Sequence, residues 1–469
     1  MNNDTANNTA RNTAKNTAND TARHEVNDPE DNGASEVGAS LTDLDAAVAV
    51  PLLGPMSRRK FLAVSGVGAT ALAATVYLRP SAFYGQASAA AISSTAKTDR
   101  IIVNIFLRGA ADGLSFLSPL GDSTYQSLRP GVAIPDASAL AVNGQFGLHP
   151  GAVRIKALLD AGQAAFIPAA GSPNSNRSHF SAQAMMDKGS SSDATLSTGW
   201  LGRYLVATSG AAEDALRAVS IGNGLQPSLR GSTAIATPTL QSLSLLSAGT
   251  GASSSQVQTA LRAMYPAAPT DLLRIQGEAA TAIVAEIAPI AATSTPPSGW
   301  PSGFGTALWP IAKLIAAGYP IEIATADLGG WDEHDAMGSA TDPTGNQHKL
   351  VAGLDAALGA FFDYIGGAAA RTTVIITTEF GRRIAINGSG GTDHGRGMVM
   401  MVLGAGVNPG VHGDWPGLID TENGDVKVVN DFRKVYAEVL GRRMRATDLS
   451  AVFPGFDTSP SNWLGVTSG

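Results

Sequence analysis

The sequence has no cysteine among its 469 residues. This absence excludes disulfide bonds, catalytic thiolates and zinc sites built from thiolates. A chain without thiols is also safe in an oxidising compartment, which is weak support for export. Any metal site in this protein must therefore be built from carboxylate, imidazole or other oxygen and nitrogen ligands.

Charged residues are scarce, at 15% of the sequence, and the net charge of −7 is accompanied by no basic patch. Because nucleic acids are bound chiefly through lysine and arginine contacts to phosphates, we expect no nucleic-acid partner. Hydrophobic residues make up 44% of the chain, which is enough for a sizeable core. The length allows one large domain or two ordinary ones.

The first 91 residues predict a leader. Residues 1–56 are a polar, low-complexity tract with repeated Asn-Thr-Ala units that cannot bury enough apolar surface to fold. Residues 57–91 begin Ser-Arg-Arg-Lys-Phe-Leu, continue with a mildly apolar run and end in small residues, which resembles a twin-arginine export signal. A transmembrane anchor is the alternative, although the glycine, serine and threonine in the run make it a poor span.

We therefore expect the twin-arginine translocase to export the protein to the periplasm or out of the cell. This route carries folded proteins, often with a cofactor already bound. We expect no later segment to be long and apolar enough to cross a membrane, so that the mature form has no stable span.

Residues 92–469 alternate apolar runs with amphipathic segments, which predicts one α/β domain. We expect a three-layer sandwich with a mostly parallel central sheet. Residues 122–148 are predicted as an irregular surface excursion and 222–300 as an accessory segment, with helices at about 256–264 and 268–291. Strands are predicted at 100–107, 164–169, 320–326, 373–378 and 397–403, and helices at 151–161, 180–188, 309–317 and 346–365.

Acidic and imidazole side chains follow several of the predicted strands. Ligands of open α/β sheets gather at the carboxyl ends of strands, so these side chains predict a site for a hard cation. In isolation Asp112 could equally be a turn former or a helix N-cap, and the acids near Asp332 could be solvated surface groups. The candidate metal ligands are Asp112, Asp332, His334, Glu379, Asp393 and His394.

A second group of polar residues stands between a predicted strand and a predicted helix. Ser178 is a candidate nucleophile, with Arg177 and His179 as its catalytic neighbours, because an anion is favoured at a helix N-terminus. Ser175 remains an alternative nucleophile, and Ser178 could instead be a plain N-cap. The candidate substrate contacts are Arg382, His149 and His412.

Seven short motifs together resemble a known bacterial exported family. They are Arg-Gly-Ala-Ala-Asp-Gly-Leu at 108–114, Phe-Gly-Leu-His-Pro at 146–150, Asn-Arg-Ser-His-Phe at 176–180, Gly-Trp-Leu-Gly-Arg at 199–203, Gly-Trp-Asp-x-His at 330–334, Glu-Phe-Gly-Arg at 379–382 and Gly-Thr-Asp-His-Gly at 391–395. The family is catalogued as "domain of unknown function fifteen-oh-one". The resemblance implies an alkaline phosphatase/sulfatase-like fold, in which a hydroxyl nucleophile works beside metals held by aspartate and histidine.

These observations predict an exported metal-dependent hydrolase that acts on a phosphate or related ester, either a small molecule or a polymer. Carboxylates and imidazoles suit zinc, manganese, magnesium or calcium as the divalent metal. The alternative is a non-catalytic exported protein that retains the fold and binds a metal or a partner at the cell envelope.

Overall fold

The computed structural model describes residues 99–192, 196–208, 215–243, 283 and 285–469. The predicted leader and export signal lie outside these residues. So do the predicted helix at 256–264 and most of the one at 268–291.

The described residues form a central, mostly parallel sheet with strand order β11-β5-β10-β9-β1-β8-β6-β7, with β14 also paired to β5. Only β10 runs antiparallel to its neighbours, β9 and β5. The sheet confirms the predicted α/β class. Its strands are β1 (Ile101–Leu107), β5 (Ala164–Gly171), β6 (Ala218–Ile221), β7 (Ile235–Thr237), β8 (Ile323–Leu328), β9 (Thr372–Thr378), β10 (Met398–Gly404), β11 (Gly410–Val411) and β14 (Asn430–Asp431).

The side chains of β1 alternate between two hydrophobic clusters, one on each face of the sheet. Val103 and Ile105 belong to the cluster that includes the helices α9 (Phe304–Ala316) and α10 (Asn346–Ile365). Ile102 and Phe106 belong to the cluster on the opposite face. Because both faces are covered, the strands are apolar throughout, as expected for a buried parallel sheet.

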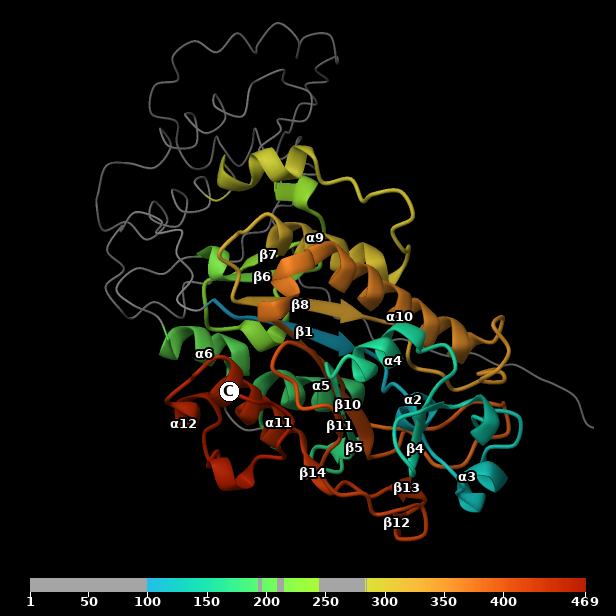
Figure 1. Ribbon diagram of the computed structural model, residues 1–469. Coiled ribbons are helices and arrows are strands. Elements are labelled where there is room, and N and C mark those ends of the chain that lie inside the picture. Colours follow the sequence, from blue (N-terminus) through green and yellow to red (C-terminus); the bar gives the residue numbers. More distant parts are fainter. Residues whose placement is uncertain (1–98, 193–195, 209–214, 244–282, 284) are drawn as a thin grey trace, which may run out of the picture. The chain divides into compact units, whose positions relative to one another are not determined.

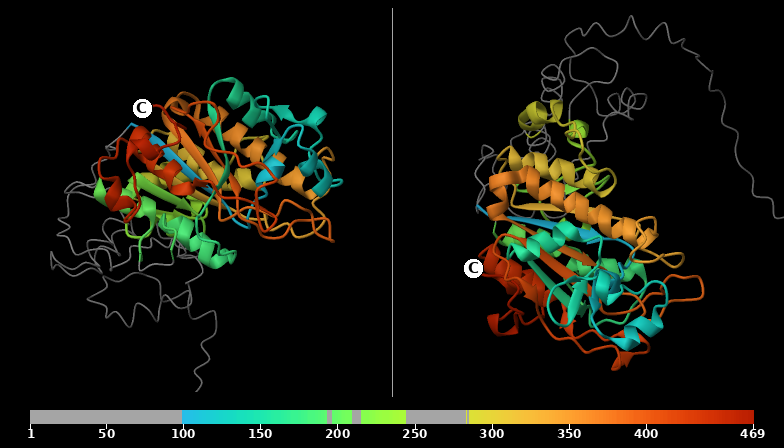
Figure 2. Two further views of the ribbon diagram at one scale, coloured as in Figure 1. Left: turned by 90° about the horizontal axis from the view of Figure 1, so that it is seen from below. Right: turned by 45° about the vertical axis from the view of Figure 1, so that its right-hand side comes forward.

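The helices accordingly form two outer layers, and the predicted three-layer arrangement is confirmed (Figure 1). Both further views also separate α9 and α10 from the carboxyl-terminal helices (Figure 2). The helices with the first cluster are α4 (Val153–Asp160), α9 and α10, and those with the second are α5 (His179–Lys188), α6 (Trp200–Ala207), α11 (Phe432–Glu438) and α12 (Leu449–Val452).

The strand register brings several loops to one edge of the sheet. Leu107 at the end of β1 pairs with Leu328 at the end of β8 and with Thr378 at the end of β9. The antiparallel β10 begins at this edge, and β5, which is antiparallel to β10, ends there. The segments after β1, β5, β8 and β9 and the segment before β10 therefore converge, as expected for a ligand site in such a sheet.

The prediction of an irregular excursion at 122–148 was wrong in part. One short α-helix and two strands occur here, and the strands complete a small antiparallel sheet with strand order β2-β4-β3, because Tyr125, Phe146 and Leu148 bury their side chains. The elements within 122–148 are α3 (Ser123–Leu128), β3 (Leu140–Ala141) and β4 (Phe146–Leu148), and α2 (Gly113–Phe116) and β2 (Leu117–Pro119) directly precede them. A separate hairpin joins β12 (Thr421–Glu422) to β13 (Asp425–Val426).

The expectation of no later segment long and apolar enough to cross a membrane was also wrong. By length and composition alone, Asn346–Arg371 meets that description, with a mean hydropathy of 1.3. Half of the 18-residue apolar stretch in this segment is buried inside the domain, where α10 packs against α9 and α4. Burial of this kind is typical of a core helix, whose apolar face contacts its neighbours.

The loop after β9 passes unusually close to the segment before β10, and this contact requires a glycine at position 381. A Cβ atom on Gly381 would lie 1.8 Å from the carbonyl oxygen of Gly397. The two segments are also joined by backbone hydrogen bonds from Gly381 to Arg396 and from Gly395 to Gly381. A side chain here would push apart two of the segments that converge at the sheet edge.

We therefore expect Gly381→Ala to lower the free energy of unfolding by about 1–3 kcal/mol or more, because the backbone has to move. Gly388→Ala is the control, since nothing lies within 4 Å of a Cβ built there. Its free energy of unfolding should change by less than about 1 kcal/mol. Urea denaturation of both variants is the measurement, and equal stabilities would contradict the steric explanation.

Candidate metal centre

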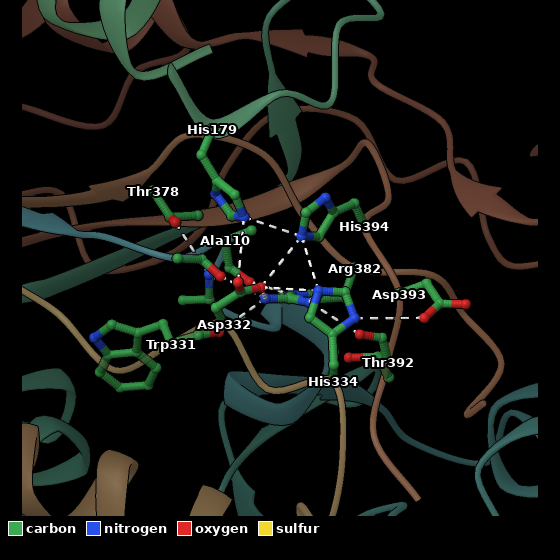
Figure 3. A network of polar contacts seen from close by, with 12 residues as sticks. Ala110, His179, Trp331, Asp332, His334, Thr378, Arg382, Thr392, Asp393 and His394 are labelled. Carbon is green, nitrogen blue, oxygen red and sulfur yellow. Dashed lines mark hydrogen bonds and ion pairs between the residues drawn. The ribbon is translucent and has the colours of Figure 1, made fainter. Parts of the chain in front are cut away.

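Three imidazoles and one carboxylate meet at the sheet edge where the loops converge (Figure 3). His179 is the first residue of α5, which follows β5, and His394 stands just before β10. Asp332 and His334 are on the segment after β8. We call these four residues the histidine cluster.

The Nε2 atoms of His179 and His334 each face that of His394. The Nε2 atom of His394 lies 3.0 Å from that of His179 and 3.0 Å from that of His334. Ligand atoms on neighbouring corners of a tetrahedral zinc site, with bonds of about 2.0–2.1 Å, are roughly 3.3 Å apart. Each of these two distances is therefore close to that between ligands of one metal ion. The described residues whose ligand atoms all lie within 4.8 Å of one another are His179, Asp332 and His394, and His334 is outside that set.

The carboxylate of Asp332 completes the cluster. Its Oδ1 atom lies 3.0 Å from the Nε2 atom of His334 and 3.2 Å from that of His394, and it accepts a hydrogen bond of 2.6 Å from Arg382. Its Oδ2 atom lies 3.5 Å from the Nε2 atom of His179. One oxygen is thus held by the arginine, and the other is left for a ligand.

Each imidazole also has an acceptor behind it. The Nδ1 atom of His179 lies 2.7 Å from Oε1 of Glu379, and that of His394 lies 3.2 Å from the carbonyl oxygen of Arg177. An acceptor at Nδ1 favours the tautomer that carries its proton there, so that the lone pair on Nε2 points into the cluster. This is the usual outer arrangement around metal-bound histidine.

Glu379, which we predicted as a metal ligand, lies behind His179. Its side chain is buried, and Oε1 accepts hydrogen bonds of 2.9 Å from the amide of Gly109 and 2.8 Å from Gln183. Burial raises the pKa of Glu379, but the hydrogen bonds from His179 and Gln183 outweigh it, so the pKa is below its ordinary value. The structure thus gives this carboxylate an orienting position, with both oxygens engaged.

Asp393, another predicted ligand, has a similar but looser position behind His334. Its Oδ1 atom lies 3.5 Å from the Nδ1 atom of His334 and accepts a hydrogen bond of 3.0 Å from Asn387. The hydrogen bond from Asn387 is the largest cause of a pKa below the ordinary value of Asp393. Its carboxylate is more than half exposed, at 55%, so this contact is weaker than the one between Glu379 and His179.

The environments of the cluster give its histidines different pKa values. The hydrogen bond to Glu379 is the main cause of a raised pKa for His179. Burial is the main cause of a lowered pKa for His394, which keeps that imidazole neutral and able to bind a metal. Burial raises the pKa of Asp332, but hydrogen bonds from Arg382 and His394 bring it below the ordinary value.

Arg382, a predicted substrate contact, is buried at 2% exposure and joins the segments around the site. Its Nε atom donates a hydrogen bond of 2.7 Å to the carbonyl of Ala110, and Nη1 donates one of 2.9 Å to the carbonyl of Thr392. Nη2 donates to the carbonyls of Gly109 and Trp331, at 2.5 and 3.1 Å. Together with the bond to Asp332, these contacts engage the guanidinium within the protein.

Asp112, predicted as a metal ligand, is not part of the histidine cluster. Its carboxylate accepts a hydrogen bond of 3.1 Å from the amide of Leu114 and caps α2, which was the alternative weighed from the sequence. It also forms a buried ion pair of 2.5 Å with Arg129. This arginine, which directly follows α3 in the chain, could not be assigned as the partner from the sequence pattern.

Ser178 occupies the N-cap position of α5, but its hydroxyl forms no capping hydrogen bond. The residue is exposed, as is Ser175. Arg177, its predicted neighbour, forms an ion pair with Asp425 and donates a hydrogen bond of 3.3 Å to the carbonyl of His394.

The other two predicted substrate contacts are placed elsewhere. His149 is fully buried, its Nδ1 accepts a hydrogen bond of 3.0 Å from the amide of Gly151, and its ring packs edge-on against His348. His412 is half-buried, with Nε2 located 2.8 Å from the carbonyl oxygen of Asn408. Within the described residues, no hydrogen bond or ion pair connects either histidine to the cluster.

Sequence reasoning did not single out Gln183, which supports the site, or the buried acid Glu333 beside it. Gln183 binds Glu379, and its position four residues after His179 on one helix could have placed both on the same face. Glu333 stands between two members of the cluster, and burial raises its pKa to about 8. Its Oε1 atom has no hydrogen-bond partner among the described residues. No pattern distinguished it from its acidic neighbours.

Replacing Glu379 should weaken metal binding, because its carboxylate orients His179 and increases the basicity of that ring. We expect Glu379→Gln to lower the affinity for zinc about 10–100-fold. Asp393→Asn is the matched control, since Asp393 is exposed and lies farther from its histidine. Competition with a chelating dye measures both affinities, and equal losses would contradict the difference in role.

His149 should make the protein sensitive to acid. Burial is the main cause that lowers its pKa to about 4, below the ordinary value of 6.5. As the pH falls below 6.5, the histidine therefore takes up a proton in the unfolded state but not yet in the folded state. The free energy of unfolding decreases until about pH 4, where the folded state is protonated as well. The total effect is on the order of 3 kcal/mol.

We expect His149→Gln to lose less of its free energy of unfolding than the wild type between pH 7 and pH 4.5. Urea denaturation at the two pH values gives the comparison. Carboxylates that titrate in this window contribute to both proteins alike, so the difference between them isolates the histidine. A wild type and variant with the same pH dependence would show that His149 is not held neutral by burial.

No curated protein matches the chain. A protein in the alkaline phosphatase superfamily from Vibrio parahaemolyticus is 9% identical, with 83% of this chain and 76% of that chain covered and a TM-score of 0.33. The PsFucS1 sulfatase from Pseudoalteromonas sp. is 12% identical, with 78% and 70% covered and a TM-score of 0.29.

Both TM-scores are low, so the function of this chain has to be inferred from its own side chains. The family of the chain, by contrast, is established by a match to its sequence. A family model described as "Protein of unknown function (DUF1501)" matches residues 99–453, which is more than half of the chain. The chain belongs to this family, as its seven motifs predicted.

Proposed function

We propose that this protein is a metal-dependent hydrolase of phosphate or related esters, with one divalent cation held by the histidine cluster. The observation that carries the proposal is the convergence of three Nε2 atoms, each 3.0 Å from the next along the row His179, His394 and His334. His179, His394 and Asp332 also offer ligand atoms that all lie within 4.8 Å of one another. Two imidazoles and one carboxylate, with the imidazole of His334 beside them, favour zinc over magnesium or calcium, which prefer oxygen ligands, and three protein ligands leave the fourth zinc position open.

Exposure of the cluster favours a catalytic site over a purely structural one. The side chains of Asp332 and His334 are 48% and 46% exposed, and those of His179 and His394 are 25% and 24% exposed. Structural zinc sites are closed by four protein ligands, whereas catalytic sites keep a position open to water or substrate. A cation bound here would lower the pKa of a water or hydroxyl group and offset negative charge on the ester.

We assign the role of nucleophile to Ser178. Its hydroxyl is exposed, directly precedes His179 and is not engaged in a capping hydrogen bond. The first amides of α5, which have no carbonyl partner within the helix, would bind the anionic group of the ester. Arg177, which also pairs with Asp425, connects this helix start to the carbonyl of His394.

One observation favours the alternative of a non-catalytic metal-binding protein. No described imidazole or carboxylate is hydrogen bonded to the Ser178 hydroxyl, so no general base is visible beside it. Both nitrogens of His179 are already engaged, one with Glu379 and one within the cluster. In this alternative the cluster would hold a metal with no turnover of an ester.

We further propose export through the twin-arginine translocase to the periplasm or beyond. The support is the Arg-Arg-Lys-Phe-Leu motif at 58–62, followed by an apolar run and small residues. Transport of a folded chain would allow the histidine cluster to bind its cation before export. Cell fractionation of the wild type and of an Arg58→Lys/Arg59→Lys variant measures this, and equal export of both would contradict the proposal.

Two variants separate metal binding from catalysis. We expect the wild-type protein to contain about one zinc per chain and to hydrolyse p-nitrophenyl phosphate or p-nitrophenyl sulfate. His394→Ala should lose both the metal and the activity. Ser178→Ala should keep the metal while kcat falls about a thousandfold or more. Elemental analysis and initial rates are the measurements.

Ser175→Ala is the matched control, because Ser175 is the neighbouring exposed serine. It should retain both metal and activity. An inactive Ser175→Ala with an active Ser178→Ala would reassign the nucleophile, and two active variants would assign that role to water. A wild type with bound metal but no activity on any ester would favour the non-catalytic alternative, and one without metal would contradict the proposal.

A further inference from the structure

We infer that a pocket beside the histidine cluster binds the organic part of the ester substrate, and that this part is a ring with a second negative charge. The inference rests on the proposed function, because the cluster would hold the reacting ester group. We call this cavity the α5 pocket. Its volume is about 500 Å³, within the range of small-molecule sites.

The α5 pocket and the histidine cluster share one helix. Gln183 lines the pocket and donates a hydrogen bond of 2.8 Å to Glu379, the residue that orients His179. Phe180, also in the pocket wall, directly follows His179 in the chain. A substrate with its ester group at the cluster could therefore extend along α5 into the pocket.

The arginine in the pocket wall is already paired with acids. Arg108 forms ion pairs of 3.0 Å with the buried Asp187 and 2.9 Å with Asp327, and both acids also line the pocket. Its guanidinium stacks on the ring of Phe106 at 3.7 Å. Because two carboxylates surround it, Arg108 is held in place and is a poor candidate for binding an anionic ligand.

Two other cations line the pocket without such partners. Lys188 is the last residue of α5, and the exposed Arg230 follows β6 and a short turn. Neither side chain forms a close ion pair or a side-chain hydrogen bond with a described residue, and the charge of Arg230 acts on Asp187 only through space. Their charges are available to a carboxylate, sulfate or phosphate on the ligand, which arginine binds with two parallel hydrogen bonds.

The exposed ring of Phe180 indicates that the ligand also contains a ring. It is 87% exposed, although it lies in the pocket wall next to a residue of the cluster. A single exposed aromatic residue needs no explanation by itself. Here it follows a cluster residue in the chain and lines the same pocket as Lys188 and Arg230, so it would stack on a ring of a substrate that reaches from the cluster to these cations. The pocket therefore selects for a ring and an anion together.

The test compares two probes that differ by one carboxylate, phenylphosphonate and 4-carboxyphenylphosphonate. Neither can be hydrolysed by cleavage of an ester, so isothermal titration calorimetry on the zinc-loaded mature protein measures binding without turnover. We expect the carboxylated probe to bind about tenfold tighter. Lys188→Ala and Arg230→Ala should each reduce this preference, and the double variant should abolish it.

Phe180→Ala should weaken both ring-containing probes several-fold relative to methylphosphonate, which has no ring to stack. Lys349→Ala, which removes an exposed lysine of α10 outside the pocket, is the control and should keep the full preference. Equal affinities of the two probes for the wild type, failure of both to bind, or a preference that persists in the double variant would overturn the inference.

The experiments distinguish a failure of the proposed hydrolase activity from a failure of the pocket inference. If the protein hydrolyses no ester but still prefers the carboxylated probe, the pocket inference stands and the proposed activity is wrong. If it hydrolyses phenyl phosphate and 4-carboxyphenyl phosphate with equal kcat/KM and binds their phosphonates equally, the activity stands and the pocket inference is wrong.

Discussion

The candidate metal centre depends on the buried guanidinium of Arg382. A buried cation has to satisfy its donors within the protein, and a guanidinium carries five N–H groups in fixed directions. Here those donors reach backbone carbonyls after β1, after β8 and before β10, as well as Asp332. Because one rigid group binds all three segments, it sets the distance between the loop that carries Asp332 and the loop that carries His394.

The buried carboxylate of Glu379 orients one of the histidines near the segments that Arg382 joins. Glu379, at the end of β9, faces His179 on one side and the amide of Gly109 on the other. Glu379 can reach these partners because β1, β8 and β9 end at the same level of the sheet. Helix α5 then extends the site, since its first residue belongs to the cluster and its later turns line the pocket.

Much of the fold could be predicted, because a strand buried on both faces of a parallel sheet appears in the sequence as a continuous apolar run. The apolar runs at 101–107 and 372–378 and the amphipathic pattern of α10 were placed within a residue or two. The candidate site was predicted less completely. Polar residues after strands were found, but their assignment as ligands or supports was not, and Glu379 and Asp112 occupy supporting positions.

Composition and pattern were enough to establish an α/β domain, to exclude thiolate chemistry and to gather polar candidates at one sheet edge, because these follow from local periodicity and residue type. The tertiary structure decided which atoms meet. Whether His179 offers its Nε2 to a metal, or Asp112 instead caps a helix, depends on Glu379 and Arg129, which are far away or unmarked in the chain. Side-chain direction is set by such long-range partners, and a linear pattern does not record them.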